Sequence, residues 1–158
     1  MKLIVMSDSH GNFRIIDHII QNFHADLYIH LGDGERELNT AYTMYPDKKF
    51  LHVAGNCDFA SLSPDELLIC PDNKTSVFAV HGHKYNVKYS LDKLKKTALS
   101  KYADIVLYGH THSRFLEYDN GLYIMNPGSV SIPRDGKRPS FGIIDITFNG
   151  IVTNIVDL

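Results

Sequence analysis

The sequence has few cysteines, no long apolar run and no excess of basic charge, and each absence excludes a class of protein. Cys57 and Cys70 are the only cysteines in the chain, and they form no CxxC motif. This usage argues against a disulfide scaffold and suits a reducing cytosol, so we expect a cytoplasmic protein. No apolar run approaches the roughly 18 residues of a membrane span. The N-terminal run 1–6 is too short for a secretion signal.

The net charge and the length of the chain further limit the kinds of protein that it can be. The formal net charge of -2 leaves no basic excess to neutralise a nucleic-acid backbone, so no nucleic-acid partner is expected. A chain of 158 residues with 44% hydrophobic content is long enough for a proper core. Because it contains no repeat, linker or low-complexity tract, we expect one domain over residues 1–158. Histidine is unusually frequent, and four of the nine histidines form the doublets His81-Gly82-His83 and His110-Thr111-His112.

Apolar runs and helical periodicity predict an α/β fold. Residues 2–6, 27–31 and 50–54 are short apolar runs typical of buried strands. Between them, helical spacing predicts helices over about 12–23 and 35–45, the second with Leu38, Ala41 and Tyr42 facing inward. Alternating strands and helices of this kind give a parallel sheet with right-handed crossovers.

The second half of the chain predicts another sheet. Residues 66–70 and 75–80 flank a turn and should form a hairpin. A helix capped by Ser90 should follow, with its lysines solvated and its inner face formed by Leu91, Leu94, Ala98, Leu99 and Tyr102. The remaining strands, two pairs of them joined by tight turns, are expected at 105–108, 115–118, 122–126, 141–148 and 151–156. We therefore expect two sheets face to face, helices outside, and the loops after the strands meeting along one edge.

Polar residues follow five of the predicted strands. Asp8 and His10 come first, and in an extended chain both side chains can aim at one point. The later loops supply, in order, Asp33, then Asn56 with Asp58, then His81, then His110 with His112. The gaps from one loop to the next are 25, 23, 25 and 29 residues, about one strand with its crossover each. A lone Gly-Asp is usually a turn, but five such loops at even spacing predict a metal site.

The motifs resemble those of a known family. Their order is Asp8-x-His10, Gly32-Asp33, Gly55-Asn56-x-Asp58, His81 and Gly109-His110-x-His112, and it resembles the calcineurin-like metallophosphoesterase superfamily. The short length, Gly-Asn-Cys-Asp and Asn126-Pro-Gly-Ser129 are similar to its small prokaryotic phosphodiesterase branch. The resemblance implies a four-layer α/β/β/α sandwich, with two mixed sheets flanked by helices and a two-metal centre at the strand ends.

The resemblance also implies which side chains bind each of two divalent ions. One divalent ion would be held by Asp8, His10 and His112. The other would be held by Asn56, His81 and His110. Asp33 would bridge the two ions, and a hydroxide between them would attack the phosphorus of a small phosphate ester. Mixed nitrogen and oxygen donors favour manganese, with nickel, iron, zinc or magnesium as alternatives. A homo-oligomer such as a dimer would be typical of the resembling proteins.

One position departs from the larger superfamily. Many members have a histidine where this chain has Cys57, and that histidine would protonate the leaving group. A thiol with an ordinary pKa near 8.5 is a poor general acid, which points to diesters or activated substrates. The alternative reading makes Cys57 a small buried residue. Asp58 would orient a ligand or its own loop.

Three further residues have two interpretations each. Asn12 is expected either to contact a phosphoryl oxygen or, as the safer interpretation, to cap the first helix. His83 lies either beside the site or in solvent. Arg134, in a loop flanked by prolines, either clamps phosphate or is an ordinary surface residue. The histidines without a motif are interpreted as structural: His18, His24, His30 and His52.

Two alternatives to a two-metal enzyme remain at this point. The first is a protein-binding scaffold on the same fold, like the retromer subunit of the superfamily, in which the metal site is degraded. The second is a hydrolase with a single metal. All seven candidate positions here carry residues able to bind metal, which favours the enzyme, and an extra carboxylate at Asp33 makes a single metal less attractive.

Overall fold

The first half of the chain alternates strands with helices, as expected. The computed structural model describes residues 1–158. Strands β1 (Lys2–Met6), β2 (Leu27–His30) and β3 (Phe50–His52) are parallel neighbours. Helices α1 (Phe13–Asn22) and α2 (Glu35–Met44) connect them. The hairpin of β9 (Ser140–Thr147) and β10 (Gly150–Asp157) joins antiparallel to β1, so the first sheet has the order β10-β9-β1-β2-β3.

The second sheet comes from the middle of the chain. Its order is β4-β5-β6-β8-β7, with strands β4 (Glu66–Ile69), β5 (Val77–Val80), β6 (Ile105–Leu107), β7 (Arg114–Asp119) and β8 (Leu122–Pro127). The three inner strands β5, β6 and β8 are parallel, and the edge strands β4 and β7 are antiparallel to their neighbours. A short 3-10 helix, η1 (His83–Tyr85), and helix α3 (Asp92–Ser100) connect β5 to β6. All ten strands predicted from the sequence are therefore present.

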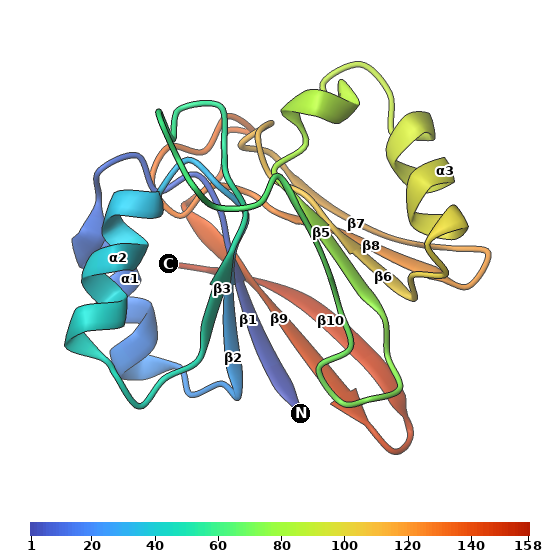
Figure 1. Ribbon diagram of the computed structural model, residues 1–158, viewed down its shortest axis with the longest axis horizontal. Coiled ribbons are helices and arrows are strands. Elements are labelled where there is room, and N and C mark those ends of the chain that lie inside the picture. Colours follow the sequence, from blue (N-terminus) through green and yellow to red (C-terminus); the bar gives the residue numbers. More distant parts are fainter.

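The two sheets pack face to face between helices. The apolar run of β1 is continuous because both faces of the strand are buried. Leu3 and Val5 face the second sheet, and Ile4 and Met6 face α1 and α2. All four side chains are fully buried, and burial of each contributes about 1.5–3 kcal/mol to folding. A third apolar cluster joins α3 to the outer face of the second sheet. Figure 1 shows α1 and α2 on one side of the sheets and α3 on the other, which confirms the four-layer sandwich.

Helix α3 is shorter than predicted. Only Leu94 and Ala98 of the helix are fully buried, whereas Leu99 is 53% exposed and Tyr102 is 88% exposed. Tyr102 lies beyond the last helical residue with a φ of 55°, so helical spacing no longer applies to it. Leu91 directly precedes the first helical residue, and the Ser90 hydroxyl accepts the N–H of Asp92 over 3.0 Å, so Ser90 still supplies a partner for a free N–H of the first turn, as predicted.

Two other expectations about side chains are wrong. Tyr42 is 40% exposed instead of facing fully inward, because its ring packs at a steep angle against that of Phe50 and its hydroxyl donates to the Phe50 carbonyl. Asn12 occupies the cap position of α1 but makes no capping hydrogen bond. Its amide instead donates to the Ser131 hydroxyl over 3.4 Å, which ties the first loop to the one after β8.

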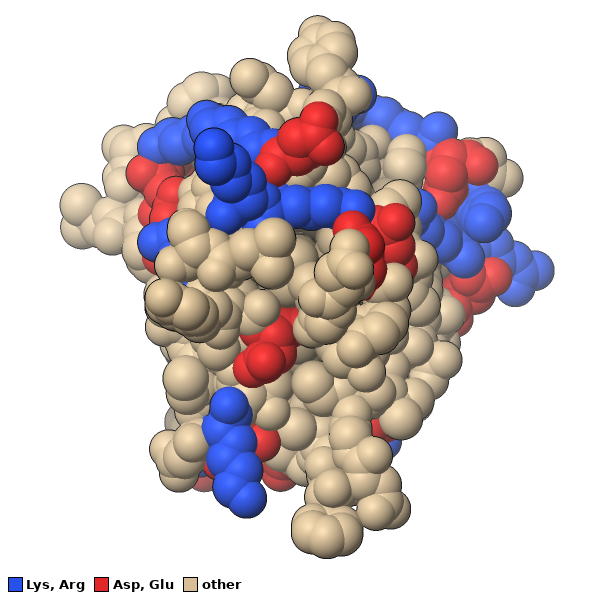
Figure 2. All heavy atoms as spheres, turned by 90° about the vertical axis from the view of Figure 1, so that its right-hand side faces the viewer, with Lys and Arg blue, Asp and Glu red and all other residues tan.

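The face that carries α3 mixes charges of both signs. Figure 2 shows basic and acidic side chains interspersed over its upper part. Lys95 donates to Glu117 and Asp119 of the β7 edge, so its charge is locally neutralised. None of the three α-helices is long and apolar enough to cross a bilayer.

Candidate metal centre

The carboxyl ends of β1, β2, β3, β5 and β6 bring all seven predicted ligands to one edge of the sandwich. Hydrogen bonds join the loops across the two sheets. The Asp8 N–H donates to the Gly32 carbonyl over 3.1 Å within the first sheet. The His110 N–H donates to the Asp8 carboxylate over 3.1 Å between the sheets. The even spacing of motifs in the sequence therefore corresponds to a set of neighbouring strand ends.

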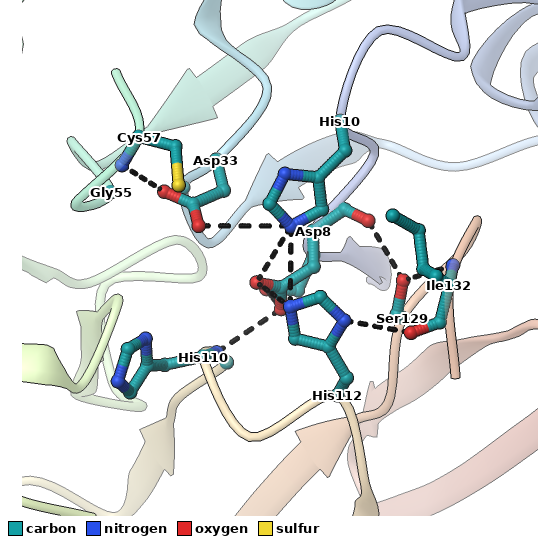
Figure 3. Close-up of polar contacts among 12 residues, drawn as sticks. Asp8, His10, Asp33, Gly55, Cys57, His110, His112, Ser129 and Ile132 are labelled. Atoms are coloured by element: carbon teal, nitrogen blue, oxygen red, sulfur yellow. Dashed lines mark hydrogen bonds and ion pairs between the residues drawn. The ribbon is translucent and has the colours of Figure 1, made fainter. Parts of the chain in front are cut away.

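The first predicted ligand group forms a compact cluster (Figure 3). The Nε2 atoms of His10 and His112 are 3.2 Å apart. The Asp8 Oδ1 atom lies 3.2 Å from His112 Nε2 and 3.9 Å from His10 Nε2. Donor atoms about 2.0–2.2 Å from a shared ion are roughly 3–4 Å from one another. The three side chains thus have the separations that one cation requires.

The second predicted group is equally compact. His81 Nε2 lies 3.1 Å from Asn56 Oδ1 and 3.2 Å from His110 Nδ1. The three donor atoms come from three different loops and meet at the His81 ring. The two separations from His81 match those of donors around one cation.

Asp33 lies between the two groups. Its Oδ2 atom is 3.7 Å from His10 Nε2 of the first group and 3.5 Å from His81 Nε2 of the second. Its other oxygen, Oδ1, accepts the N–H of Cys57 over 2.7 Å. One carboxylate oxygen is therefore anchored to the backbone, and the other faces donors of both groups.

The Asp8 carboxylate has one satisfied oxygen and one that is not. Oδ2 accepts from the Ser7 hydroxyl over 2.6 Å and from the His110 N–H. Oδ1 is buried and has no hydrogen-bond partner, an arrangement that costs folding energy unless something else binds the oxygen. Burial alone would raise the pKa of Asp8, but His112, His81 and Ser7 outweigh it and the pKa is lowered. An anionic, unpartnered oxygen among imidazoles fits a cation.

The histidines are held in the orientation that metal binding needs. His81 Nδ1 donates to the Leu31 carbonyl and His112 Nδ1 to the Ile132 carbonyl, each over 2.7 Å. The Nε2 lone pair of each ring therefore faces the cluster. Burial, His81 and then Lys88 lower the pKa of His110 to about 4, so this imidazole is neutral and able to bind metal at physiological pH.

The backbone around the cluster is strained. Ten non-glycine residues have a positive φ, and five of them are predicted ligands: Asp8, His10, Asp33, His110 and His112. Such left-handed conformations cost of order 1–3 kcal/mol each and collect at functional sites. Gly55 is required for close packing, because a Cβ atom there would collide with the side chain and N–H of Asp33. The placement of these donor atoms therefore lowers the stability of the fold.

Asp58 holds the loop that carries Asp33. Its two oxygens accept four backbone N–H groups, from Asp33, Gly34, Glu35 and Gly55, over 2.7–3.0 Å. Burial would raise the pKa of Asp58, but these donors outweigh it and the pKa is lowered. Because its oxygens are occupied in this way, Asp58 orients the loops after β2 and β3.

Cys57 is exposed, so the reading of a small buried residue is wrong. Its thiol lies with His10 and Asp33 in a group whose donor atoms are all within 4.8 Å of one another. Partial desolvation and the Asp33 carboxylate raise the pKa of Cys57 to about 11. The thiol is therefore protonated at neutral pH and faces the cluster.

The secondary candidates lie around this cluster. The His83 ring centre is 5.4 Å from that of His81, and its Nδ1 is buried without a partner. Arg134 is exposed, and its N–H donates to the His112 carbonyl over 2.9 Å. Asn126, near the end of β8, donates to the Gly109 carbonyl and to Thr111, which supports the His110 loop.

Sequence reasoning missed Ser7 and Arg36 at the site, and it noted Ser129 only as part of a motif, without a contact. Ser7 donates to Asp8, as described above, and Ser129 donates to the Asp8 carbonyl over 2.8 Å. Arg36 is exposed, forms no ion pair, and lines a cleft of about 220 Å³ together with His10, Asp33 and Cys57. Ser7 and Arg36 lie within three positions of Asp8 and Asp33, respectively. This closeness to a motif aspartate could have indicated from the sequence that they lie at the site.

Comparison with known proteins identifies a family and close structural neighbours. A family model, the calcineurin-like phosphoesterase superfamily domain, matches residues 1–149. The chain is 32% identical over 160 residues to the probable metallophosphoesterase YsnB of Bacillus subtilis, covering 99% of this chain and 91% of that protein. It is 30% identical over 172 residues to the phosphodiesterase YfcE of Escherichia coli, covering 92% and 88%.

Solved structures show the same fold. A protein from Streptococcus pneumoniae described as a predicted phosphoesterase superimposes with a TM-score of 0.84 at 27% identity, covering 99% of this chain and 88% of that one. Vps29 of Entamoeba histolytica, in a complex with zinc, superimposes with a TM-score of 0.75 at 18% identity, covering 99% of each. At that identity the second likeness concerns the fold alone.

Proposed function

Because the chain belongs to the calcineurin-like phosphoesterase superfamily, we propose that it is a phosphodiesterase that depends on two divalent cations. The observation that carries the proposal is the place of Asp33. Its free oxygen is 3.7 Å and 3.5 Å from a nitrogen of each of two three-donor groups. Two cations at the roughly 3.5–4 Å of two-metal sites require a shared anion, and this oxygen can supply it.

The proposed ligand sets follow the two clusters. Asp8, His10 and His112 would hold one cation, Asn56, His81 and His110 would hold the other, and Asp33 would contact both. Bound there, the cations would acidify water and neutralise charge on the phosphate ester. The unpartnered Oδ1 of Asp8 supports the first set, and the anchored ring of His81 supports the second.

The remaining side chains determine how the leaving group departs. Asp58 fixes the loops that carry Asp33 and Asn56. Cys57 faces the cluster with a neutral thiol and provides no imidazolium, so the leaving oxygen departs as an anion or takes a proton from water. We therefore propose small phosphodiesters with good leaving groups as the substrates, entering beside Arg36 through the cleft that also contains His10.

The proposal extends to the metal and the compartment. Neutral imidazoles combined with carboxylate and amide oxygens favour manganese, with nickel, iron, zinc or magnesium as alternatives. Two free cysteines, Cys57 and Cys70, suit the reducing cytoplasm. A homodimer would be in keeping with the family resemblance.

The alternative is a protein-binding scaffold, which the fold of Vps29 also serves. One Vps29 structure is a complex with zinc, so metal binding by itself does not separate the two functions. Catalysis separates them. The complete set of seven donors, with their supporting hydrogen bonds, favours the enzyme.

An assay of metal-stripped and metal-loaded protein tests the proposal. We expect the stripped protein to be inactive on bis(4-nitrophenyl) phosphate and manganese to restore hydrolysis, because the donors alone provide no electrophile for the phosphate oxygens. A screen of phosphorylated compounds would then rank the substrates. Failure of the metal-loaded protein to hydrolyse any of them would favour the scaffold.

A further inference from the structure

A second cleft adjoins the loop that carries His110 and His112. It is a shallow, open cleft of about 460 Å³. Thr111 and Ser113, which alternate with the two histidines in the sequence, line this cleft, while the histidine rings face the metal-ligand cluster. One segment of backbone therefore separates the cleft from the cluster. A ligand in the cleft would lie next to a phosphate at the cluster.

The cleft contains two unpaired cations. Of its three basic residues, Arg114 forms ion pairs with Asp135 and Asp157. Lys88 and Arg134 are exposed and have no carboxylate partner. The backbone of Arg134 is tied to the His112 carbonyl, which keeps this residue beside the ligand loop. A lysine and an arginine that line the same cleft without a carboxylate partner form a favourable environment for a phosphate group.

Three of the eight residues that line the cleft are hydrophobic. Val87 and Tyr108 are buried, and Phe115 is half-buried, with the two aromatic ring centres 6.3 Å apart. Such a wall favours the sugar or base of a nucleotide over a simple inorganic ion. The cleft thus combines two unpaired cations with one half-buried aromatic ring, that of Phe115.

We propose that the Lys88–Arg134 cleft binds a second, unreacting phosphate group of the substrate, and that the preferred substrates are nucleoside phosphodiesters carrying a further phosphate on the sugar. The proposal rests on the phosphodiesterase function proposed above. In the reaction, the oxygen of water bonds to the phosphorus at the metal-ligand cluster, one of its protons passes to solvent, and the bond to the leaving oxygen breaks. The leaving group keeps that electron pair, and the second phosphate is unchanged.

A matched pair of substrates tests the proposal. The 4-nitrophenyl ester of thymidine 5′-phosphate and the same ester with an added 3′-phosphate release the same nitrophenolate from the same diester. We expect the wild-type kcat/KM to favour the 3′-phosphorylated ester by roughly tenfold or more, the scale of a charge-assisted contact. In Lys88→Gln and Arg134→Gln this preference should fall toward one. Because it is a ratio within each variant, it is insensitive to a general loss of activity.

Lys137→Gln is the control, since Lys137 is an exposed cation of the same loop as Arg134 but does not line the cleft. It should keep the wild-type preference. A wild-type ratio near one, or the same ratio in the cleft variants as in the control, would overturn the proposal.

Binding without turnover separates this proposal from the proposed function. Calorimetry compares thymidine 3′,5′-bisphosphate with thymidine 5′-phosphate on wild-type and variant protein. Tighter binding of the bisphosphate that is lost in the cleft variants supports the cleft even if no ester is hydrolysed, in which case only the phosphodiesterase function fails. Equal binding of the two probes by the wild type overturns the cleft.

Discussion

Replacement of Asp33 by asparagine is expected to abolish hydrolysis of an aryl phosphodiester while the domain stays folded. Asparagine keeps an oxygen for the Cys57 N–H but lacks the charge that faces His10 and His81. Loss of a group that only supports a metal ligand costs about 10–100-fold, so the loss here should be larger. His81→Ala should have a similar effect, because it removes the ring at which the second donor group meets.

Circular dichroism and a rate assay on the same samples measure both effects. Asp47→Asn and His24→Ala are matched controls, because both residues are exposed and lie in none of the donor groups. The controls should retain activity. Near-wild-type rates in Asp33→Asn or His81→Ala would count against the two-cation mechanism.

The second large effect concerns leaving groups. The Cys57 thiol provides no imidazolium, and a well-placed general acid is typically worth about 10²–10⁴-fold. The rate should therefore fall steeply as the pKa of the leaving group rises, with activated aryl diesters the best substrates. Cys57→Ser should change this dependence little. Cys57→His should flatten it, since the exposed position gives the ring room beside Asp33.

A series of substituted phenyl phosphodiesters, assayed with all three proteins, measures the dependence. A flat series in the wild type would mean that another residue already donates the proton. His83 is then the first candidate, since its ring lies beside those of His81 and His110.

The fold was predictable because its inner strands β1, β2, β5 and β6 are buried on both faces. Runs such as 2–6 are continuously apolar for that reason, and a simple count of apolar residues finds them. Helix ends were less predictable. No glycine or proline follows Ser100, so the periodic pattern continues to Tyr102, although the helix ends two residues earlier.

The candidate site was predictable in its residues but not in its geometry. The order and spacing of the motifs indicate that five loops meet, because each gap equals one crossover. They do not indicate the left-handed backbone at Asp8 or Asp33, nor that Asp58 accepts four N–H groups. Lys88 has no pattern around it in the sequence, and only the packing of η1 and its following loop brings it beside the ligand loop.

The most direct measurement of the central claim is the number and position of bound ions in manganese-soaked crystals, determined by anomalous diffraction. We expect two ions within about 4 Å of each other, one beside Asp8, His10 and His112 and the other beside Asn56, His81 and His110, with an Asp33 oxygen on both. A single ion under saturating manganese, with Asp33 free, would contradict the account.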